Sequence, residues 1–402
     1  MRKYNQKFLK SCNQGLILEL LKKNGPKSRA QISKDIGIVR STVSEITNEM
    51  VSLNVIYEGS KVTGNLGKRP TLLYFNKDFY YFVAAVIAPH YIDLAVCNLN
   101  GEIIKEKELK YTDDISAKDV IKLAQKNIDK IISDLDIEKI CLVSVGSPET
   151  FNIKTGIIKW APYIHDWVGI DLKSIFEEKY KVDVIVKLHI KLETLGEQWK
   201  SFNNVSNMVY LFIGRGIGAG VVIDGKVREG KNGYLGEIAF LPLSEKIDYE
   251  EIKKGDKNLG YFESKCDIKK IETLVKEYYR SKGIKKNFKN FSDIAGLYKE
   301  NIEIKKLINK NIIRTLALGI ASIIIMLDPE VVVINGEITE LGEDFLNLLR
   351  NEIFNITPYK REIVFSKLKN KSGIYGAIRN GLDYIEKCIY ENPELFYKFV
   401  KL

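Results

Sequence analysis

The side chains best suited to a chemical role near the start of the chain lie between residues 40 and 47. They are short hydroxyls, one guanidinium and one carboxylate, groups that hydrogen-bond to the base edges and phosphates of DNA. The residues are Arg40, Ser41, Thr42, Ser44, Glu45 and Thr47. A second group, Lys68 and Arg69 in a glycine-bearing loop, can meet the DNA backbone or minor groove. The pattern predicts double-stranded DNA as a partner.

Three short helices are expected to position these side chains. Apolar residues recur at every fourth position from Phe8 to Leu20, and Ile17 and Leu21 widen this stripe, which predicts an amphipathic helix. The run SRAQ at 28–31 is a capping-box pattern that opens a second helix, with the candidate DNA contact Arg29 at its start. Gly37 supplies a turn before the third helix. This is the helix-turn-helix order, in which the last helix enters the major groove.

The third helix and a following strand pair complete the expected head. The inward side of the third helix is expected to carry Val43, Ile46, Met50 and Leu53. Residues 55–57 and 71–75 read as two strands, and the loop between them is a basic wing. A three-helix protein-docking module shows the same hydrophobic pattern, but the polar start of the third helix and the basic wing favour DNA. We therefore expect residues 1–76 to form a winged helix-turn-helix.

The distribution of charge agrees with this reading. The chain of 402 residues carries a formal net charge of +10. Residues 1–75 contain 13 Lys/Arg and 5 Asp/Glu, so +8 of that charge lies in this small segment. Such a concentration of positive charge favours a polyanionic partner.

Other features favour a cytoplasmic protein without a membrane segment. The five cysteines are scattered and form no CxxC pair. The first residues lack the apolar run of a secretory signal. The longest uncharged apolar stretch, 315–327, has 13 residues, which is too short to span a bilayer. We expect a buried helix there.

The rest of the chain alternates strand and helix patterns, which predicts an α/β domain in two lobes. Strands are expected at 81–87, 94–99, 140–145, 208–213 and 219–223, with a helix at 117–135. Gly214 to Gly220 (GRGIGAG) has the composition of a phosphate cradle. A strand rather than a helix follows it, so a dinucleotide-binding fold is not expected. Asp224-Gly225 predicts a tight hairpin turn.

Several separate motifs resemble the ROK family of repressors and sugar kinases. The run from Gly214 to Glu237 is similar to the family's glycine signature. Residues 26–70 resemble the DNA-binding head of its repressor branch, and residues 146–167 its sugar-side loop. Residues 328–336 and 376–377 resemble its C-terminal segments. The resemblance implies an actin-like (ribonuclease H-like) two-lobed fold, with a first lobe at 77–190 completed by about 374–402 and a second lobe at 191–373.

The chain departs from the family at its catalytic positions. In the stretch 86–90, Val86 stands where family kinases have a metal-facing acid, and Pro89 replaces a glycine whose amide would meet phosphate. Alignment on Leu-Gly-Glu at 195–197 places Leu188 on the family's Asn and His189 on its catalytic Asp. These losses predict that the chain is not an enzyme and takes no cofactor.

The family's structural zinc site is also altered. Phe240, Lys254 and Tyr261 stand at positions where the family has zinc ligands, and none of these side chains suits tetrahedral zinc. We therefore expect no metal, and we expect the surrounding loop to be held by packing.

By resemblance, two sugar-contacting acids survive, Glu237 and Glu263, and we add Glu149 and His189 as candidate effector contacts. The resemblance implies a homodimeric repressor of carbohydrate-utilisation genes, bound to a palindromic operator and tuned by a sugar or sugar phosphate such as xylose. Two alternatives stay open. One is an active sugar kinase with an appended DNA-binding head, and the other is a regulator whose effector is a protein.

Overall fold

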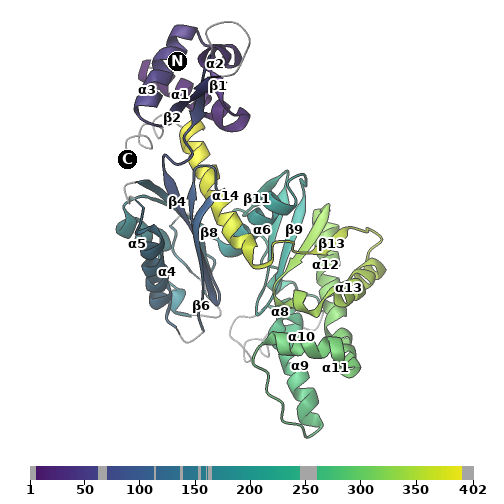
Figure 1. Cartoon of the computed structure of the whole chain (residues 1–402). Coiled ribbons are helices and arrows are strands. Elements are labelled where there is room, and N and C mark those ends of the chain that lie inside the picture. Colours follow the sequence, from purple (N-terminus) through teal and green to yellow (C-terminus); the bar gives the residue numbers. More distant parts are fainter. Residues whose placement is uncertain are drawn as a thin grey trace.

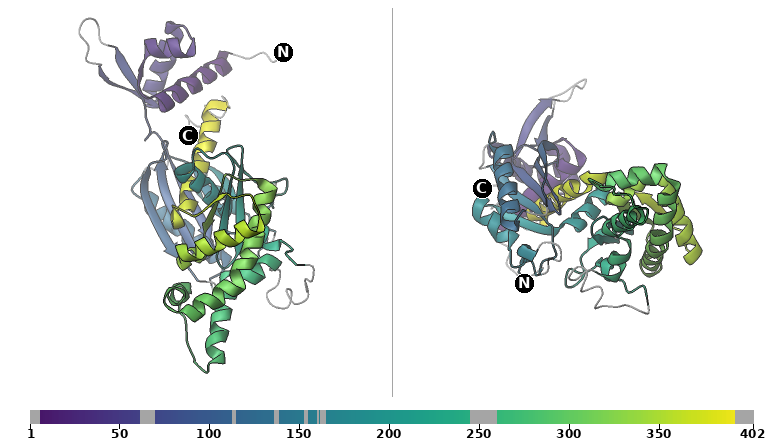
Figure 2. Two further views of the ribbon diagram at one scale, coloured as in Figure 1. Left: turned by 90° about the vertical axis from the view of Figure 1, so that its right-hand side faces the viewer. Right: turned by 90° about the horizontal axis from the view of Figure 1, so that it is seen from below.

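The computed structural model describes residues 6–61, 70–112, 115–135, 139–152, 155–159, 161, 165–244 and 260–391. The predicted architecture of a winged helix-turn-helix followed by a two-lobed α/β domain is confirmed. The head lies at one end of the molecule, and a group of helices in the second lobe lies at the other end (Figures 1 and 2).

The head consists of three helices and a small antiparallel sheet of order β1-β3-β2. Its elements are α1 (Gln6–Asn24), β1 (Lys27–Ser28), α2 (Arg29–Ile36), α3 (Arg40–Ser52), β2 (Ile56–Lys61) and β3 (Thr71–Phe75). The predicted capping box is present, because the Ser28 side chain accepts from the Gln31 amide while the Gln31 side chain accepts from the Ser28 amide. Gly37 ends α2 with φ 70°, a left-handed conformation that favours glycine.

Two expectations about the core of the head are wrong. In α1 Ile17 and Leu21 are buried as predicted, together with Leu18, but Leu16 is 47 % exposed. A spacing of four residues drifts around a helix, while spacings of three and four in alternation stay on one face. In α3 Leu53 is 41 % exposed, because it lies beyond the last helical turn.

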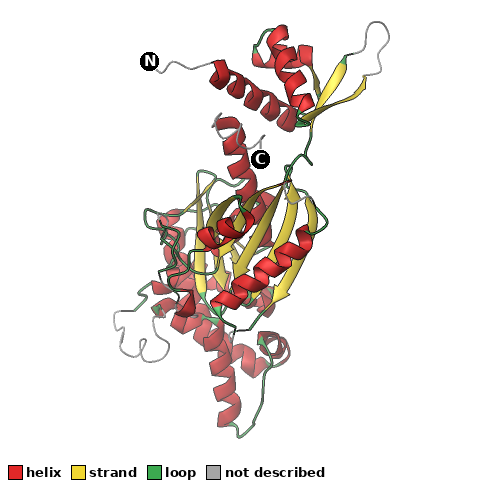
Figure 3. Cartoon of the chain, turned by 90° about the vertical axis from the view of Figure 1, so that its left-hand side faces the viewer, coloured by secondary structure: helices red, strands yellow, loops and turns green. Residues whose placement is uncertain are grey.

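The first lobe is built on a five-stranded sheet of order β6-β5-β4-β7-β8. Its elements are β4 (Tyr81–Ala88), β5 (Tyr91–Asn98), β6 (Ile103–Lys110), α4 (Ala117–Ile132), β7 (Ile140–Ser147), a short helix at His165–Trp167, α5 (Leu172–Tyr180) and β8 (Asp183–Leu188). Alternate residues of β4 enter two different cores: Val83 and Ala85 face α4 and α5, while Phe82 and Ala84 face the C-terminal helix. Helices therefore cover both faces of the sheet (Figure 3).

The second lobe has a five-stranded sheet of order β11-β10-β9-β12-β13. Its strands are β9 (Met208–Ile213), β10 (Ile217–Ile223), β11 (Lys226–Arg228), β12 (Val331–Asn335) and β13 (Glu362–Phe365). Its longer helices are α6 (His189–Ser201), α8 (Tyr261–Cys266), α9 (Ile268–Ser281), α10 (Phe291–Glu300), α11 (Ile302–Ile308), α12 (Arg314–Leu327) and α13 (Glu343–Ile356). Short helical turns lie at Ile238–Phe240 and Glu337–Leu341, and a π-helical segment at Asn309–Ile313 joins α11 to α12. The predicted Asp224-Gly225 turn is confirmed, with positive φ at both residues.

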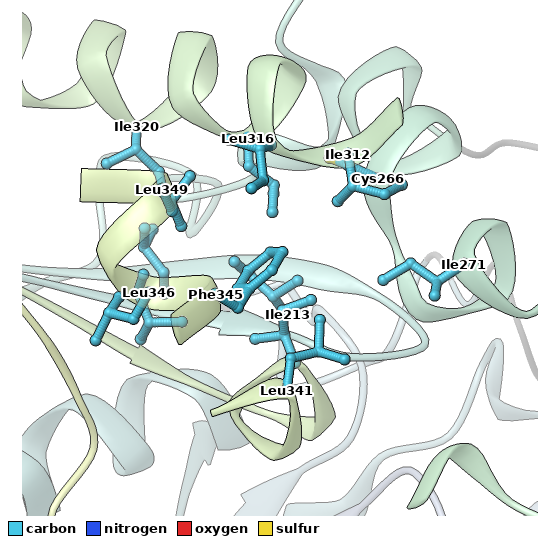
Figure 4. Close-up of a cluster of buried hydrophobic side chains, with 14 of the residues drawn as sticks. Ile213, Cys266, Ile271, Ile312, Leu316, Ile320, Leu341, Phe345, Leu346 and Leu349 are labelled. Atoms are coloured by element: carbon cyan, nitrogen blue, oxygen red, sulfur yellow. The ribbon is translucent and has the colours of Figure 1, made fainter. Parts of the chain in front are cut away.

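The helix from Ile302 to Leu327 runs without a break for 26 residues, which is longer than the 13-residue stretch identified in the sequence. By length and composition alone it could cross a membrane. Its apolar side instead packs in the core of the second lobe, where Ile312, Leu316 and Ile320 meet Phe345 and the sheet residue Ile213 (Figure 4). This environment is that of a core helix.

The two lobes are joined by a close crossing of α6 with α14 (Ser372–Glu386), which follows a short turn at Lys369–Lys371. A Cβ at Gly196 would lie 1.9 Å from the carbonyl oxygen of Ser372. A Cβ at Gly376 would lie 1.7 Å from that of Leu192. Both glycines are therefore required for the two backbones to touch.

Buried polar groups fix this crossing. Glu197 is fully buried and accepts hydrogen bonds from the hydroxyls of Ser366 (2.7 Å) and Ser372 (2.9 Å) and from the Lys367 amide (2.9 Å). Glu193, one turn earlier, accepts from the hydroxyl of Tyr91 in the first lobe (3.1 Å) and of Tyr210 in the second (3.1 Å). A buried carboxylate is stable only when such donors satisfy it.

The far end of α14 reaches the head (Figure 1). Ile17, Leu18 and Leu21 of α1 belong to the same buried cluster as Leu382 and Ile385 of α14. The Lys22 ammonium lies 3.0 Å from the Glu386 carboxylate. Helix α14 thus forms one side of the interlobe crossing and also contacts the DNA-binding head.

We expect Gly196→Ala to destabilise the protein by about 3 kcal/mol or more, because the new methyl group would overlap backbone that has no room to move. The matched control is Gly296→Ala in α10, where an added Cβ meets nothing within 4 Å. That change should stabilise the helix by up to about 1 kcal/mol. Thermal unfolding followed by circular dichroism measures both. Equal melting temperatures for the two variants would contradict the close crossing.

Candidate DNA interface and effector cleft

Helix α3 presents a polar start to solvent, as its sequence predicts. The side chains of Arg40, Ser41 and Glu45 are exposed, and those of Thr42 and Ser44 are partly exposed. Glu45 also lies 3.5 Å from the Lys10 ammonium of α1.

Thr47 does not face outward, and that expectation is wrong. Its side chain is fully buried, and its hydroxyl donates to the Val43 carbonyl at 2.8 Å. The same hydroxyl oxygen accepts from the Nε of Arg29 at 2.9 Å. The hydroxyl is satisfied inside the head, so burial costs little.

Arg29 holds three elements of the head together. Besides Thr47, its guanidinium donates to Asn48 of α3 at 2.8 Å and lies 2.9 Å from the Glu58 carboxylate of β2. The guanidinium therefore connects the start of α2 with α3 and with strand β2. The predicted wing residues, Lys68 and Arg69, lie outside the described residues.

The stretch that resembles the family's first phosphate loop forms a tight turn. Ala88 of β4 pairs with Tyr91 of β5, so Pro89 and His90 alone connect the strands. Pro89 has no amide proton to donate. Val86, at the place of the metal-facing acid, is fully buried in β4. At Pro89 this turn therefore has no amide to offer a phosphate.

A carboxylate lies against the glycine-rich loop that begins at Gly214. The sequence alone did not show this contact. Glu337 follows β12, and a Cβ at Gly214 would lie 2.2 Å from its Oε2. That oxygen is buried and has no hydrogen-bond partner among the described residues. Burial raises the pKa of Glu337. A carboxyl group against this glycine would repel a nucleotide phosphate when it is ionised.

His189, at the place of the catalytic aspartate, is the first residue of α6 and points to the end of β7. Its Nδ1 lies 3.2 Å from the carbonyl oxygen of Ser147. Burial lowers its pKa to about 4, so the ring is neutral at pH 7. A carbonyl partner fixes Nδ1 as the donor, which leaves Nε2 as an acceptor.

Three of the candidate effector residues form one electrostatic cluster. Burial, together with the nearby Glu237 and Glu263, raises the pKa of Glu149 to about 8. Burial raises the pKa of Glu263 to about 8 as well, and its Oε2 accepts from the Ile217 amide of the glycine loop at 3.2 Å. Its Oε1 is buried and without a partner in the part of the chain that the structure describes. Glu237 accepts from the Thr150 hydroxyl at 3.2 Å.

Lys191 and Thr150 lie in this cluster, and sequence reasoning missed both. Lys191 is 2 % exposed, and its ammonium donates to the carbonyl oxygens of Ala219 (3.1 Å) and Leu235. Burial lowers its pKa to about 8, while Glu237 acts in the opposite direction. A lysine in an amphipathic run is usually exposed, so only the fold shows its role.

Two of the three altered zinc positions, Phe240 and Tyr261, are among the described residues, and they lie close together. A Cβ at Gly260 would lie 2.6 Å from the Phe240 amide nitrogen, which places Phe240 beside the start of α8, where Tyr261 stands. Lys254 lies outside the described residues. Neither aromatic side chain is a zinc ligand, and the absence of zinc stays a prediction.

Comparison with known proteins defines the class. Residues 86–379 match the ROK family, and residues 13–57 match a winged helix-turn-helix DNA-binding family. The chain therefore belongs to the ROK family. It is 26 % identical to the xylose repressor of Caldicellulosiruptor bescii, over 93 % of this chain and 96 % of that protein. It is 28 % identical to the xylose repressor of Bacillus subtilis, over 87 % and 88 % of the two chains.

A solved structure supports the whole arrangement. The crystal structure of a ROK family transcriptional regulator, a homolog of the E. coli MLC protein, superposes with a TM-score of 0.74 at 20 % identity, covering 98 % of this chain and all of that one. The fold is therefore shared from head to C-terminal helix. The protein is a ROK-family DNA-binding transcriptional regulator that resembles the xylose repressors.

We expect Glu149→Gln to raise the melting temperature at pH 8 and to change it much less at pH 5. A carboxyl whose folded pKa is raised from 4.5 to about 8 contributes stability below pH 4.5 that is lost as the pH rises toward 8. The amide removes this loss because it does not ionise. Glu300→Gln, at an exposed position, is the control and should shift melting equally at both pH values. A Glu149→Gln shift of the same size at pH 5 and pH 8 would contradict the assigned burial.

Proposed function

We propose that this protein represses carbohydrate-utilisation genes by binding a palindromic operator as a homodimer in the cytoplasm. The observation that supports the proposal is the exposed polar start of α3, with Arg40 and Ser41 at the end of the helix that enters the major groove. Arg29 and Thr47 support that helix from within. Lys68 and Arg69, which lie outside the described residues, stay predicted DNA contacts of the wing.

The kinase-like domain serves regulation rather than catalysis in this proposal. Phosphoryl transfer needs nucleotide phosphates held in line with an activated hydroxyl. The Pro89-His90 turn removes one phosphate loop, and Glu337 lies on the other. His189 is tied to a carbonyl oxygen where a catalytic aspartate would be. These features favour a regulator over a sugar kinase with an appended head.

The effector is proposed to be a small polyol that binds near Glu149, Glu237 and Glu263. The buried Glu263 carboxyl keeps one acceptor atom without a partner among the described residues, and a sugar hydroxyl supplies the donor that such an atom needs. The repressors that this chain resembles are named for xylose, so a pentose is the first ligand to test. A thermal-shift screen over pentoses, hexoses and their phosphates separates a sugar effector from a protein effector, because a ligand of the folded state raises the melting temperature.

Arg40→Ala should weaken binding to an operator selected from random duplex DNA by about tenfold or more, because one charged contact to a base or phosphate is lost. The slope of log Kd against log salt should fall by about 1. Arg280→Ala, an exposed arginine in α9 at the opposite end of the molecule, is the matched control and should change neither quantity. Fluorescence anisotropy measures both. An unchanged Kd for Arg40→Ala would reject this interface.

His189→Asp should not create a kinase, because the phosphate loops would remain altered. A coupled assay with ATP and common monosaccharides should give background rates for the wild-type protein and for this variant. Sugar-dependent turnover by the wild-type protein at even about 1 per second, an ordinary enzyme rate, would contradict the regulatory role and favour the kinase alternative.

A further inference from the structure

The N-terminal end of α3 carries an apolar side chain that the function so far leaves unexplained. Val39 is 66 % exposed, which is unusual for a β-branched apolar residue next to a well-formed helix. It directly precedes Arg40 and Ser41, both exposed. Isolated exposed apolar residues are common on protein surfaces, so exposure alone has no meaning. The position of Val39 in the helix and its backbone conformation must be considered together with its exposure.

Val39 occupies the N-cap position of α3 without capping the helix. Its backbone is extended (φ −59°, ψ 145°), and its carbonyl accepts the first helical hydrogen bond, from Val43 at 3.1 Å. Ser, Thr, Asp and Asn are strongly preferred at this position because their side chains satisfy free amides. The preceding helix shows that preference fully, with Ser28 in a capping box.

Other helices, such as α6 and α14, also begin without a side-chain cap, so the missing cap alone assigns Val39 no role. Val39 differs from their N-cap residues because it carries a largely exposed apolar side chain. In helix-turn-helix proteins the first residues of the recognition helix reach the base edges of the major groove. The only apolar group on those edges is the 5-methyl group of thymine.

We infer that Val39 is a specificity-determining residue that contacts the 5-methyl group of one thymine in each half-site of the operator. Arg40 and Ser41 then supply the polar contacts to neighbouring bases or phosphates, and Val39 supplies an apolar one. The inference rests on the DNA-binding function and adds a base preference to it.

The test replaces single methyl groups in the DNA. The full chain first selects an operator from a random duplex library. Each thymine is then replaced in turn by deoxyuridine, which lacks only the methyl group, and Kd is measured for the wild-type protein and for Val39→Ser. Serine removes the apolar contact and introduces a helix cap, so this variant should fold at least as well as the wild type. Leu53→Ala is the control, because Leu53 is also exposed but lies at the other end of α3.

The expected result is one thymine per half-site at which deoxyuridine weakens wild-type binding about threefold to fourfold, the value of burying one methyl group. At that thymine Val39→Ser should show no loss, whereas Leu53→Ala should behave like the wild type. Equal sensitivity of the wild type and Val39→Ser at every thymine would overturn the inference while leaving the DNA-binding function intact. Failure of the wild type to select any sequence would instead reject the proposed operator binding, and the inference with it.

Discussion

Two helices from different parts of the chain meet at backbone distance, and the position of every functional region depends on this contact. Helix α6 begins with His189 and Lys191 beside the cluster of candidate effector residues, and α14 begins beside the second sheet and ends against the head. Gly196 and Gly376 remove the side chains that would keep them apart. Interiors are close-packed, so a contact with no side chains between two backbones cannot be adjusted by rotamer changes. A change in the angle between the lobes must therefore be transmitted as a movement of whole helices.

Buried carboxylates give this contact its specificity. Glu197 is held by donors from the loop before α14 and from α14 itself, and Glu193 is held by one tyrosine from each lobe. These bonds form only when the lobes and helices are correctly placed, because an unsatisfied buried carboxylate is costly. The acids near Glu149 and Glu263 differ, since Glu263 keeps an oxygen without a partner among the described residues. One set of acids thus stabilises the framework, whereas Glu263 keeps an acceptor oxygen for the effector that we propose.

Features with local causes could be predicted from the sequence. The Ser28 capping box, the Asp224-Gly225 turn and the strand at 208–213 depend on neighbouring residues, and all three are present. The family motifs likewise predicted two lobes. Strand β6 was not predicted, because its alternating lysines and glutamates (IIKEKELK) resemble a solvated segment. Its pairing with β5 becomes visible only in the folded structure. The burial of Thr47 and Lys191 was missed for the same reason, since their partners Arg29, Ala219 and Leu235 are distant in sequence.

Helix α14 connects the kinase-like domain to the DNA-binding head, and the Lys22–Glu386 ion pair is a direct probe of this connection. The measurement is the operator Kd of Lys22→Glu, Glu386→Lys and the double charge swap, compared in a double-mutant cycle. Each single reversal should shift Kd by about threefold or more, and the swap should return it to within about twofold of the wild-type value. Wild-type affinity in all three variants would rule out this coupling, because the head would then bind DNA independently of the helix that supports it.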